Sequence, residues 1–169
     1  IIMSVNSAVF SNLQSINPSA IIELFTLQLS TALHGDNTIY RFHAGSNLNA
    51  NGKIVWNGNE YLRFPIQASG FAFQKRQLPR PKIVISNATG LISSILLSVN
   101  EETTGNDLTG ATVTRIRTLA KFIDAVNFAD GTNATADPNA EFPQEIYSID
   151  RKSTETREIV EFELAGPTD

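Results

Sequence analysis

The sequence of 169 residues contains no cysteine. Without thiols the chain can form no disulfide and offers no thiolate ligand to zinc or to an iron–sulfur cluster, so its stability has to come from packing and hydrogen bonding. Histidine is also scarce, because only His34 and His43 are present. No carboxylate spacing joins these two residues into a metal-binding signature. We therefore expect no metal site and no cofactor in this chain.

A surplus of positive charge is missing as well. The formal net charge is -4, whereas domains that bind nucleic acids usually carry a basic face. No apolar run reaches the roughly 18 residues of a membrane-spanning helix, and the first residues lack the basic and apolar regions of a signal peptide. The start at Ile1 and the ending AGPTD lead us to expect a segment of a longer chain.

Enough apolar residues are present for a folded core, since 41% of the sequence is hydrophobic. Alternation of polar and apolar residues predicts β-strands, and two β-prone runs around Asn57-Gly58 predict a tight hairpin, because this dipeptide accepts positive φ. The predicted strands are 21–30, 40–43, 54–56, 60–64, 71–76, 82–86, 111–122, 145–152 and 157–164. Helical spacing predicts two short helices, over residues 4–16 and 90–99.

Strands in this number, with only two short helices, favour a mainly β fold of the β-barrel or β-sandwich class. The length suits one domain over residues 1–169, with an N-terminal helical arm over residues 1–18. The polar stretch 101–110 and the Asn-, Asp- and Gly-rich stretch 129–141 are predicted surface loops.

Motifs that carry enzyme chemistry are not found in the sequence. It has no nucleophile elbow, no phosphate-binding loop and no dinucleotide fingerprint. The acidic residues that could be paired for acid–base catalysis lie in loop-like sequence and are better explained as solvated carboxylates. Two glycosylation-type triplets begin at Asn87 and Asn133, but so short a motif occurs by chance. We predict that the chain is not an enzyme.

The strand predicted over residues 111–122 carries three basic side chains, Arg115, Arg117 and Lys121. Arg115 and Arg117 share one strand face, and the alternation breaks near Leu119, which indicates a bulge or a bend. Two interpretations stay open for the arginines. They form a solvated face, or they pair with carboxylates of an adjoining subunit, a role that suits the guanidinium group.

Several blocks of sequence, in their order, resemble the minor tail protein L family of lambda-like, long-tailed phages. The similarity runs from about residue 52 to the end of the chain. The blocks are VWNGNEY, FPIQASGF, LPRPKIVISNATG, GATVTRIRTLAKFIDAVNF with ADGTNATADPNAE, EIYSIDRKS and VEFELAGPTD. One block alone is weak evidence, whereas six in register are specific.

The resemblance implies a structural component of the distal tail tip, built as a hub-like β domain. Such a protein would join the tail tube to the host-recognition hub and help to shape the DNA conduit. The implied partners are the ring protein at the end of the tube and the central host-specificity hub protein. The resemblance further implies a homotrimeric ring around the tail axis, without direct membrane contact, through which genomic DNA passes as cargo. We expect assembly in the bacterial cytoplasm and a final location in the virion.

Family members usually continue into a cysteine-bearing C-terminal domain that resembles an iron–sulfur site, and this chain has no cysteine. The resemblance therefore implies that any cluster belongs to residues outside this sequence. Two other functions stay open, a receptor- or carbohydrate-binding module and an envelope-degrading hydrolase. A binding module would need exposed aromatic residues, whereas Trp56, Tyr40 and Tyr61 lie in strand-like sequence and are expected in the core.

Overall fold

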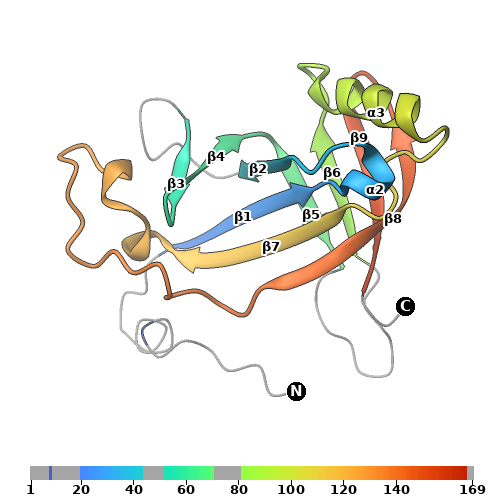
Figure 1. The fold of residues 1–169 in the computed structure, drawn as a ribbon. Coiled ribbons are helices and arrows are strands. Elements are labelled where there is room, and N and C mark those ends of the chain that lie inside the picture. Colours follow the sequence, from blue (N-terminus) through green and yellow to red (C-terminus); the bar gives the residue numbers. More distant parts are fainter. Residues whose placement is uncertain (1–7, 9–19, 44–51, 71–80, 167–169) are drawn as a thin grey trace. The chain divides into compact units, whose positions relative to one another are not determined.

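The protein is described by a computed structural model that covers residues 8, 20–43, 52–70 and 81–166. In these residues strands predominate over helices, which confirms the predicted mainly β fold (Figure 1). Apart from Ala8, the predicted helix 4–16 lies outside the described residues, as does the predicted strand 71–76. No helix in the described part of the chain is long and apolar enough to cross a membrane.

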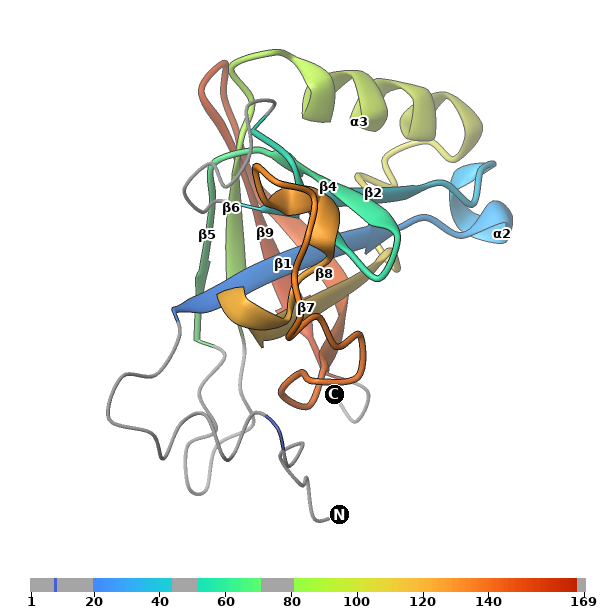
Figure 2. The same ribbon diagram turned by 90° about the vertical axis from the view of Figure 1, so that its left-hand side faces the viewer.

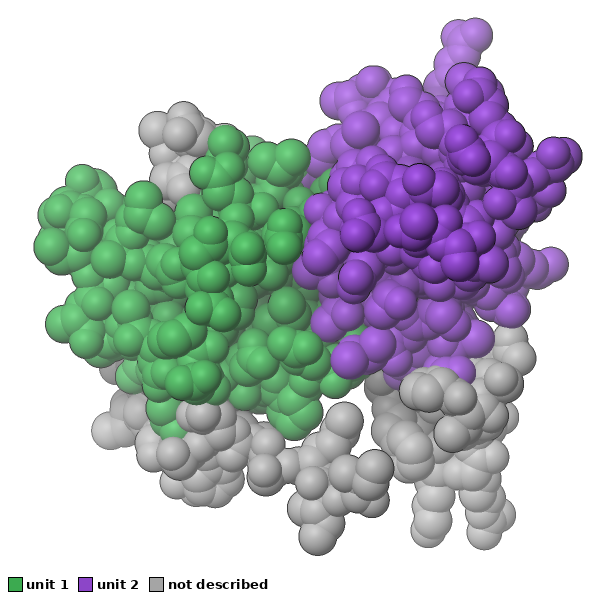
Figure 3. Space-filling model, in the orientation of Figure 1, with its two compact units in different colours: residues 1–25, 41–63, 115–145 green, residues 26–40, 64–114, 146–169 purple. Residues whose placement is uncertain are grey.

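The chain divides into two compact units (Figure 3). Unit 1 comprises residues 1–25, 41–63 and 115–145, and unit 2 comprises residues 26–40, 64–114 and 146–169. Neither unit is one continuous segment. The prediction of a single domain over residues 1–169 stays a prediction.

Unit 1 contains the strand order β3-β4-β2-β1-β7. The elements are β1 (Ile21–Gln28), β2 (Ile39–His43), β3 (Ile54–Trp56), β4 (Asn59–Arg63) and β7 (Thr112–Leu119), of which β1, β2 and β7 continue into unit 2. β3 and β4 are antiparallel, with Trp56 opposite Asn59, and this confirms the predicted hairpin. Positive φ values of 50° at Asn57 and 79° at Gly58 form its two-residue turn.

A hydrophobic cluster fills unit 1. Its buried members are Leu24, Ile54, Trp56, Tyr61, Ile116, Leu119, Phe122, Ile123 and Ala140. The predicted break in strand 111–122 is confirmed, because β7 ends at Leu119 and the 3-10 helix η1 (Ala120–Phe122) follows. A second 3-10 helix, η2 (Ala125–Asn127), comes next. These two turns bring the segment after β7 beside the β3–β4 hairpin.

Unit 2 contains the strand order β2-β1-β7-β8-β9-β6-β5. Its own strands are β5 (Ile66–Ser69), β6 (Lys82–Ser86), β8 (Glu145–Glu155, which starts in unit 1) and β9 (Ile159–Ala165). The β8–β9 hairpin is antiparallel and has register shifts between Ile149 and Arg151 and between Lys152 and Thr154. The two orders are parts of one nine-stranded sheet, and the order of the described strands does not return to its first strand, so the sheet is open.

Two α-helices belong to unit 2, α2 (Thr31–His34) and α3 (Leu91–Glu102). α3 extends the helix predicted over residues 90–99. It buries Ile92, Ile95, Leu96 and Val99, whose spacing places them on one face. Figure 2 shows α3 at the end of unit 2 where β8 and β9 are joined. The four-residue helix α2 was not predicted, because one turn has no periodicity to detect.

Candidate functional site

The arginine pair of β7, which was the candidate assembly site, lies in unit 1 and is bonded within its own chain. Both Nε and Nη2 of Arg115 contact Oε2 of Glu23 on β1 at 2.7 Å. Nη1 of the same arginine lies 3.4 Å from the carboxylate of Glu145, at the start of β8. Only 18% of the Arg115 side chain is exposed. Its guanidinium group therefore joins three strands.

Arg117, two residues further along the same face, contacts the same carboxylate. Its Nη2 lies 3.0 Å from Oε1 of Glu145, and its guanidinium carbon lies 5.0 Å from the centre of the Phe142 ring. The Nε atom is buried without a hydrogen-bond partner. Two arginines and two glutamates thus form a neutral group, which we call the arginine–glutamate cluster (Arg115, Arg117, Glu23 and Glu145).

Lys121 does not extend this row, because it lies on η1 beyond the end of β7. Its Nζ is 5.2 Å from the centre of the Phe122 ring. Its carbonyl oxygen accepts hydrogen bonds from Nδ2 of Asn133 at 3.0 Å and from Oγ1 of Thr135 at 2.5 Å. The structure therefore places the three predicted interface residues in one unit but separates Lys121 from the arginines. Their role in an interface stays a prediction.

Sequence reasoning missed two residues that hold the β3–β4 hairpin, Asp124 and Asn127. The carboxylate of Asp124 accepts hydrogen bonds from the backbone N–H groups of Asn57 and Gly58, both at 2.8 Å. Asn127, only 1% exposed, accepts from the N–H of Val55 and donates to its carbonyl, both at 2.7 Å. In the sequence these residues are visible only as two polar positions between apolar ones in FIDAVNF. That pattern does not reveal which backbone groups they bind.

The loop that follows is organised by side chains that bond to the backbone. Nδ2 of Asn133 donates to the carbonyls of Lys121 and Ile123, at 3.0 and 2.6 Å. Asp130 and Asp137 each accept from the N–H two residues ahead, at 3.1 and 3.0 Å. The stretch 129–141 is therefore a loop whose conformation is fixed by hydrogen bonds. The side-chain nitrogen of Asn133, the first residue of the second glycosylation-type triplet, is already used in such bonds.

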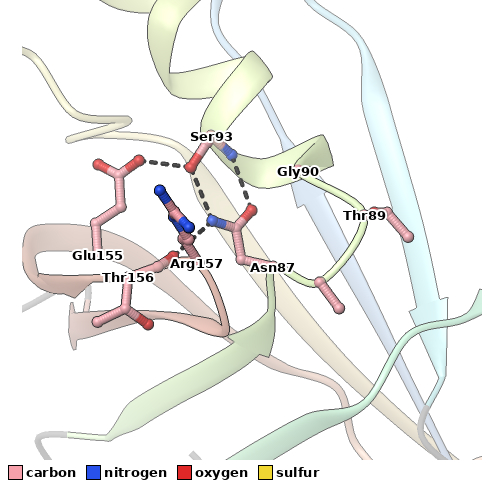
Figure 4. A pocket seen from close by; sticks show the side chains of 8 residues that line it. Asn87, Thr89, Gly90, Ser93, Glu155, Thr156 and Arg157 are labelled. Carbon is pink, nitrogen blue, oxygen red and sulfur yellow. Dashed lines mark hydrogen bonds between the residues drawn. The ribbon is translucent and has the colours of Figure 1, made fainter.

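Unit 2 has an open pocket of about 690 Å³ at the first turn of α3. Asn87, Thr89, Ser93 and Arg157 are among the residues that line it (Figure 4). Asn87 is 4% exposed, and its Nδ2 donates to Oγ of Ser93 and to the carbonyl of Thr156, both at 2.8 Å. Its Oδ1 accepts from the N–H of Ser93 at 3.2 Å. Asn87 thus replaces the missing cap of α3, because the N-cap Gly90 has no side chain to offer.

A chain of polar contacts leads away from this pocket. Oγ of Ser93 donates to Glu155 at 2.6 Å, and Nζ of Lys152 lies 2.8 Å from Glu155 and 3.2 Å from Asp107. Hydrogen bonds from Lys152 and Ser93 lower the pKa of Glu155. Asn100 forms two hydrogen bonds with Asp107, at 2.9 and 2.8 Å, which hold this residue at its positive φ of 53°. The pocket is therefore lined by groups that already bond to one another.

The two histidines have separate structural roles. In unit 2, Nδ1 of His34 accepts from the N–H of Ser30 at 2.8 Å, so Nε2 carries the proton and donates to the carbonyl of Thr109 at 3.0 Å. In unit 1, Nε2 of His43 lies 2.7 Å from the carbonyl of Gly52, and its buried Nδ1 has no partner. Burial lowers the pKa of His43. Within the described ranges no three His, Cys, Asp or Glu residues gather as metal ligands.

Comparison with known proteins identifies a family and a curated relative. The sequence model of a family described as phage minor tail protein L matches residues 31–169. A curated relative, tail tip protein L of Escherichia phage lambda, is 33% identical over 117 residues. This alignment covers 69% of the chain and 47% of the relative, so the chain spans about half the length of the curated relative it matches.

Proposed function

The chain belongs to the phage minor tail protein L family, and we propose that it joins the tail tube to the host-recognition hub at the distal tail tip. Membership of this family makes the protein a structural component of a phage tail. The finer role, at the junction of tube and hub and around the DNA conduit, is the proposal. The observation that carries it is the family match over residues 31–169, which includes most of both compact units but not the first segment of unit 1, residues 1–25.

The bonding pattern supports a structural role. Both arginines of the arginine–glutamate cluster bind carboxylates, and Asp124, Asn127 and Asn87 hold backbone groups. Groups arranged in this way hold strands and turns in place. A subunit that transmits mechanical load between its neighbours needs this rigidity. Contacts of this type do not prepare a nucleophile or an acid–base pair, which require convergent groups around a reacting atom.

The proposed neighbours are the ring protein at the end of the tail tube and the central host-specificity hub protein. We place three copies in a closed ring, because repeated head-to-tail contacts close when the rotation between subunits completes a circle. Genomic DNA would pass through the ring as cargo. Assembly would take place in the host cytoplasm, before the tail is joined into the virion.

The structure alters how the arginines would contribute to a subunit contact. Arg115 already binds two carboxylates of its own chain, so its charge is largely compensated. Lys121 is half-buried next to Asn133 and Thr135 of the loop 129–141, which bond to its carbonyl oxygen. We propose that the contact with the neighbouring subunit lies at Lys121 and at the outer edge of Arg117. Arg115 would act indirectly, by holding β7 in place.

An iron–sulfur cluster does not fit these 169 residues, because the sequence has no cysteine to bind iron. If the family resemblance extends to a cluster, its ligands lie in a part of the protein beyond this sequence. No function of the present chain is derived from it.

Immunoelectron microscopy of intact virions tests the proposed location. Antibodies against residues 145–166, which include the exposed turn of the β8–β9 hairpin at residues 155–159, should label only the distal tip of the tail. Purified tails that lack this protein should end in an unfinished tube without the hub. Label along the whole tube, or complete tips in its absence, would overturn the proposal.

A further inference from the structure

The turn of the β3–β4 hairpin contains the dipeptide that is most prone to spontaneous loss of ammonia. In an Asn-Gly pair the backbone nitrogen of glycine can attack the side-chain carbonyl carbon of asparagine, since glycine has no side chain to obstruct the approach. Both Asn57 and Gly58 are exposed to solvent, and a Cβ atom added to Gly58 would meet nothing within 4 Å. Neither crowding nor burial therefore protects this site.

The carboxylate of Asp124 is bonded to the group that would have to react. Its Oδ2 accepts a hydrogen bond from the N–H of Gly58 at 2.8 Å, and its Oδ1 accepts one from the N–H of Asn57 at the same distance. The attack needs the glycine nitrogen to lose its proton. A negative charge at this distance disfavours the amide anion that would result, because like charges repel more strongly where little water separates them.

The same two hydrogen bonds fix the backbone of the turn. Asn57 and Gly58 keep φ values of 50° and 79°, and the pairing of Trp56 with Asn59 closes the hairpin on either side. The backbone of Asp124 is itself held in place, because Nδ2 of Asn127 donates to the backbone carbonyl of Asp124 at 2.8 Å. The glycine nitrogen therefore cannot swing toward the carboxamide of Asn57 unless the contact with Asp124 breaks.

We infer that Asn57 is a latent site of deamidation and that Asp124 is the group that keeps it intact. In the reaction a bond forms between the Gly58 nitrogen and Cγ of Asn57, the bond from Cγ to the amide nitrogen breaks, and ammonia leaves with the proton taken from Gly58. Water then opens the succinimide at one of its two carbonyl carbons. The product at position 57 is aspartate or isoaspartate, each with a new negative charge.

Incubation of the full chain at mildly alkaline pH, followed by peptide mapping with mass spectrometry, tests this inference. The comparison uses the wild type, Asp124→Ala and the control Asp130→Ala, which removes a carboxylate that also bonds to the backbone of unit 1. Circular dichroism before incubation verifies that each variant is folded. We expect Asp124→Ala to lose the amide of Asn57 several-fold faster than the wild type and the control.

A reference in concentrated urea keeps the test decisive if Asp124→Ala does not fold. The wild type should then lose the amide much more slowly when folded than when unfolded. The variant Asp124→Asn, which retains one acceptor oxygen, should give an intermediate rate, and peptide mapping separates its new asparagine from Asn57. Equal rates in the folded and unfolded wild type would overturn the inference, as would a folded Asp124→Ala with the rate of the wild type.

Discussion

The side chain of Asn127 pairs with the backbone of Val55 in the manner of a neighbouring strand. Its oxygen accepts from the Val55 N–H and its nitrogen donates to the Val55 carbonyl, both at 2.7 Å. β3 is the end strand of the order described for unit 1. The carboxamide of Asn127 thus covers the centre of the β3 edge, where another strand could otherwise pair.

The variant Asn127→Ala should therefore lower the free energy of unfolding by about 2 kcal/mol, because it removes the acceptor of the Val55 N–H and leaves the Val55 carbonyl with only the longer bond of 3.4 Å from the N–H of Asp124. Urea unfolding measures this loss. The control Asn139→Ala, in the exposed part of loop 129–141, should change stability by less than about 0.5 kcal/mol. Gel filtration should also detect association of Asn127→Ala at high concentration. A stable, monomeric variant would contradict the proposed closure of the edge.

Glu145 is expected to matter more than Glu23 in the arginine–glutamate cluster. Glu145 contacts both arginines and its side chain is 16% exposed, whereas Glu23 contacts only Arg115 and is 44% exposed. Glu145→Gln should cost about 1–2 kcal/mol and Glu23→Gln at most about 0.5 kcal/mol, since solvent screens exposed ion pairs. Thermal unfolding at low and high salt measures both. An equal effect of the two substitutions would refute the ranking.

Stability should fall in mildly acidic solution because of His43. Burial lowers its pKa in the folded state below the ordinary value of 6.5, with a contribution from the charge of Arg63, while the hydrogen bond to the Gly52 carbonyl acts in the opposite direction. As the pH falls to about 6.5, His43 therefore becomes protonated in the unfolded chain while it stays neutral in the folded chain. The stability that neutral His43 contributes to the folded state is complete above this pH and is lost as the pH falls through the folded-state pKa.

The variant His43→Gln should flatten this part of the profile of unfolding free energy against pH. Glutamine can donate to the carbonyl of Gly52 but does not titrate, so the difference between the two proteins isolates His43 from other groups, His34 included. Denaturant unfolding at closely spaced pH values between 5 and 8 provides the comparison, over the range in which histidine ordinarily titrates. Parallel profiles would show that protonation of His43 is not linked to folding.

Asn87 should be essential for the first turn of α3. Asn87→Ala removes the acceptor for the N–H of Ser93 and two bonds of the buried carboxamide, which should destabilise the protein by about 2 kcal/mol. The control Thr89→Ala changes an exposed residue of the same pocket and should have little effect. Hydrogen exchange should localise the loss to the amides of residues 91–94. Unchanged protection there would argue against a capping role.

Lys121 offers the cleaner test of a subunit contact. Reversal of charge at Arg115 and Arg117 would break ion pairs inside unit 1, so lost assembly could reflect lost folding. Lys121→Glu also removes the contact with the Phe122 ring, so the melting temperature of the isolated chain first verifies that the variant is folded. The folded variant should reduce the yield of infectious tails in complementation. Arg157→Glu, which changes an exposed arginine of unit 2, is the control. Normal tails from the Lys121 variant would remove the proposed contact.

Elements with a local signal could be predicted from the sequence. The Asn57-Gly58 hairpin, the strand with Arg115 and Arg117, its end at Leu119 and the helix over residues 90–99 were all visible in turn chemistry and periodicity. β5 is absent from the predicted strands, because it is short and begins directly after Pro65. It is the end strand in the order of unit 2.

Contacts between distant residues could not be predicted in this way. Arg115 is 92 residues from Glu23, and Asn127 is 72 residues from Val55. A bond from a side chain to a distant backbone group leaves no period in the sequence, and any of the acidic residues could have been the partner of the arginines. The sequence therefore revealed which residues were basic, and only the fold revealed that their charges are compensated within the chain.

The division of both units into separate segments constrains how the protein is made. Three of the five crossings between the units fall within β1, β2 and β7, and another follows the first residue of β8. During translation unit 1 lacks its last segment until residue 145 has left the ribosome, and the last strand of unit 2 emerges later still. Neither unit can be excised as a cassette, exchanged between phages by simple recombination, or completed on the ribosome far ahead of the other. The nascent chain therefore keeps apolar strands exposed until the last segments have been synthesised. A bacterial chaperone would protect these strands during that interval.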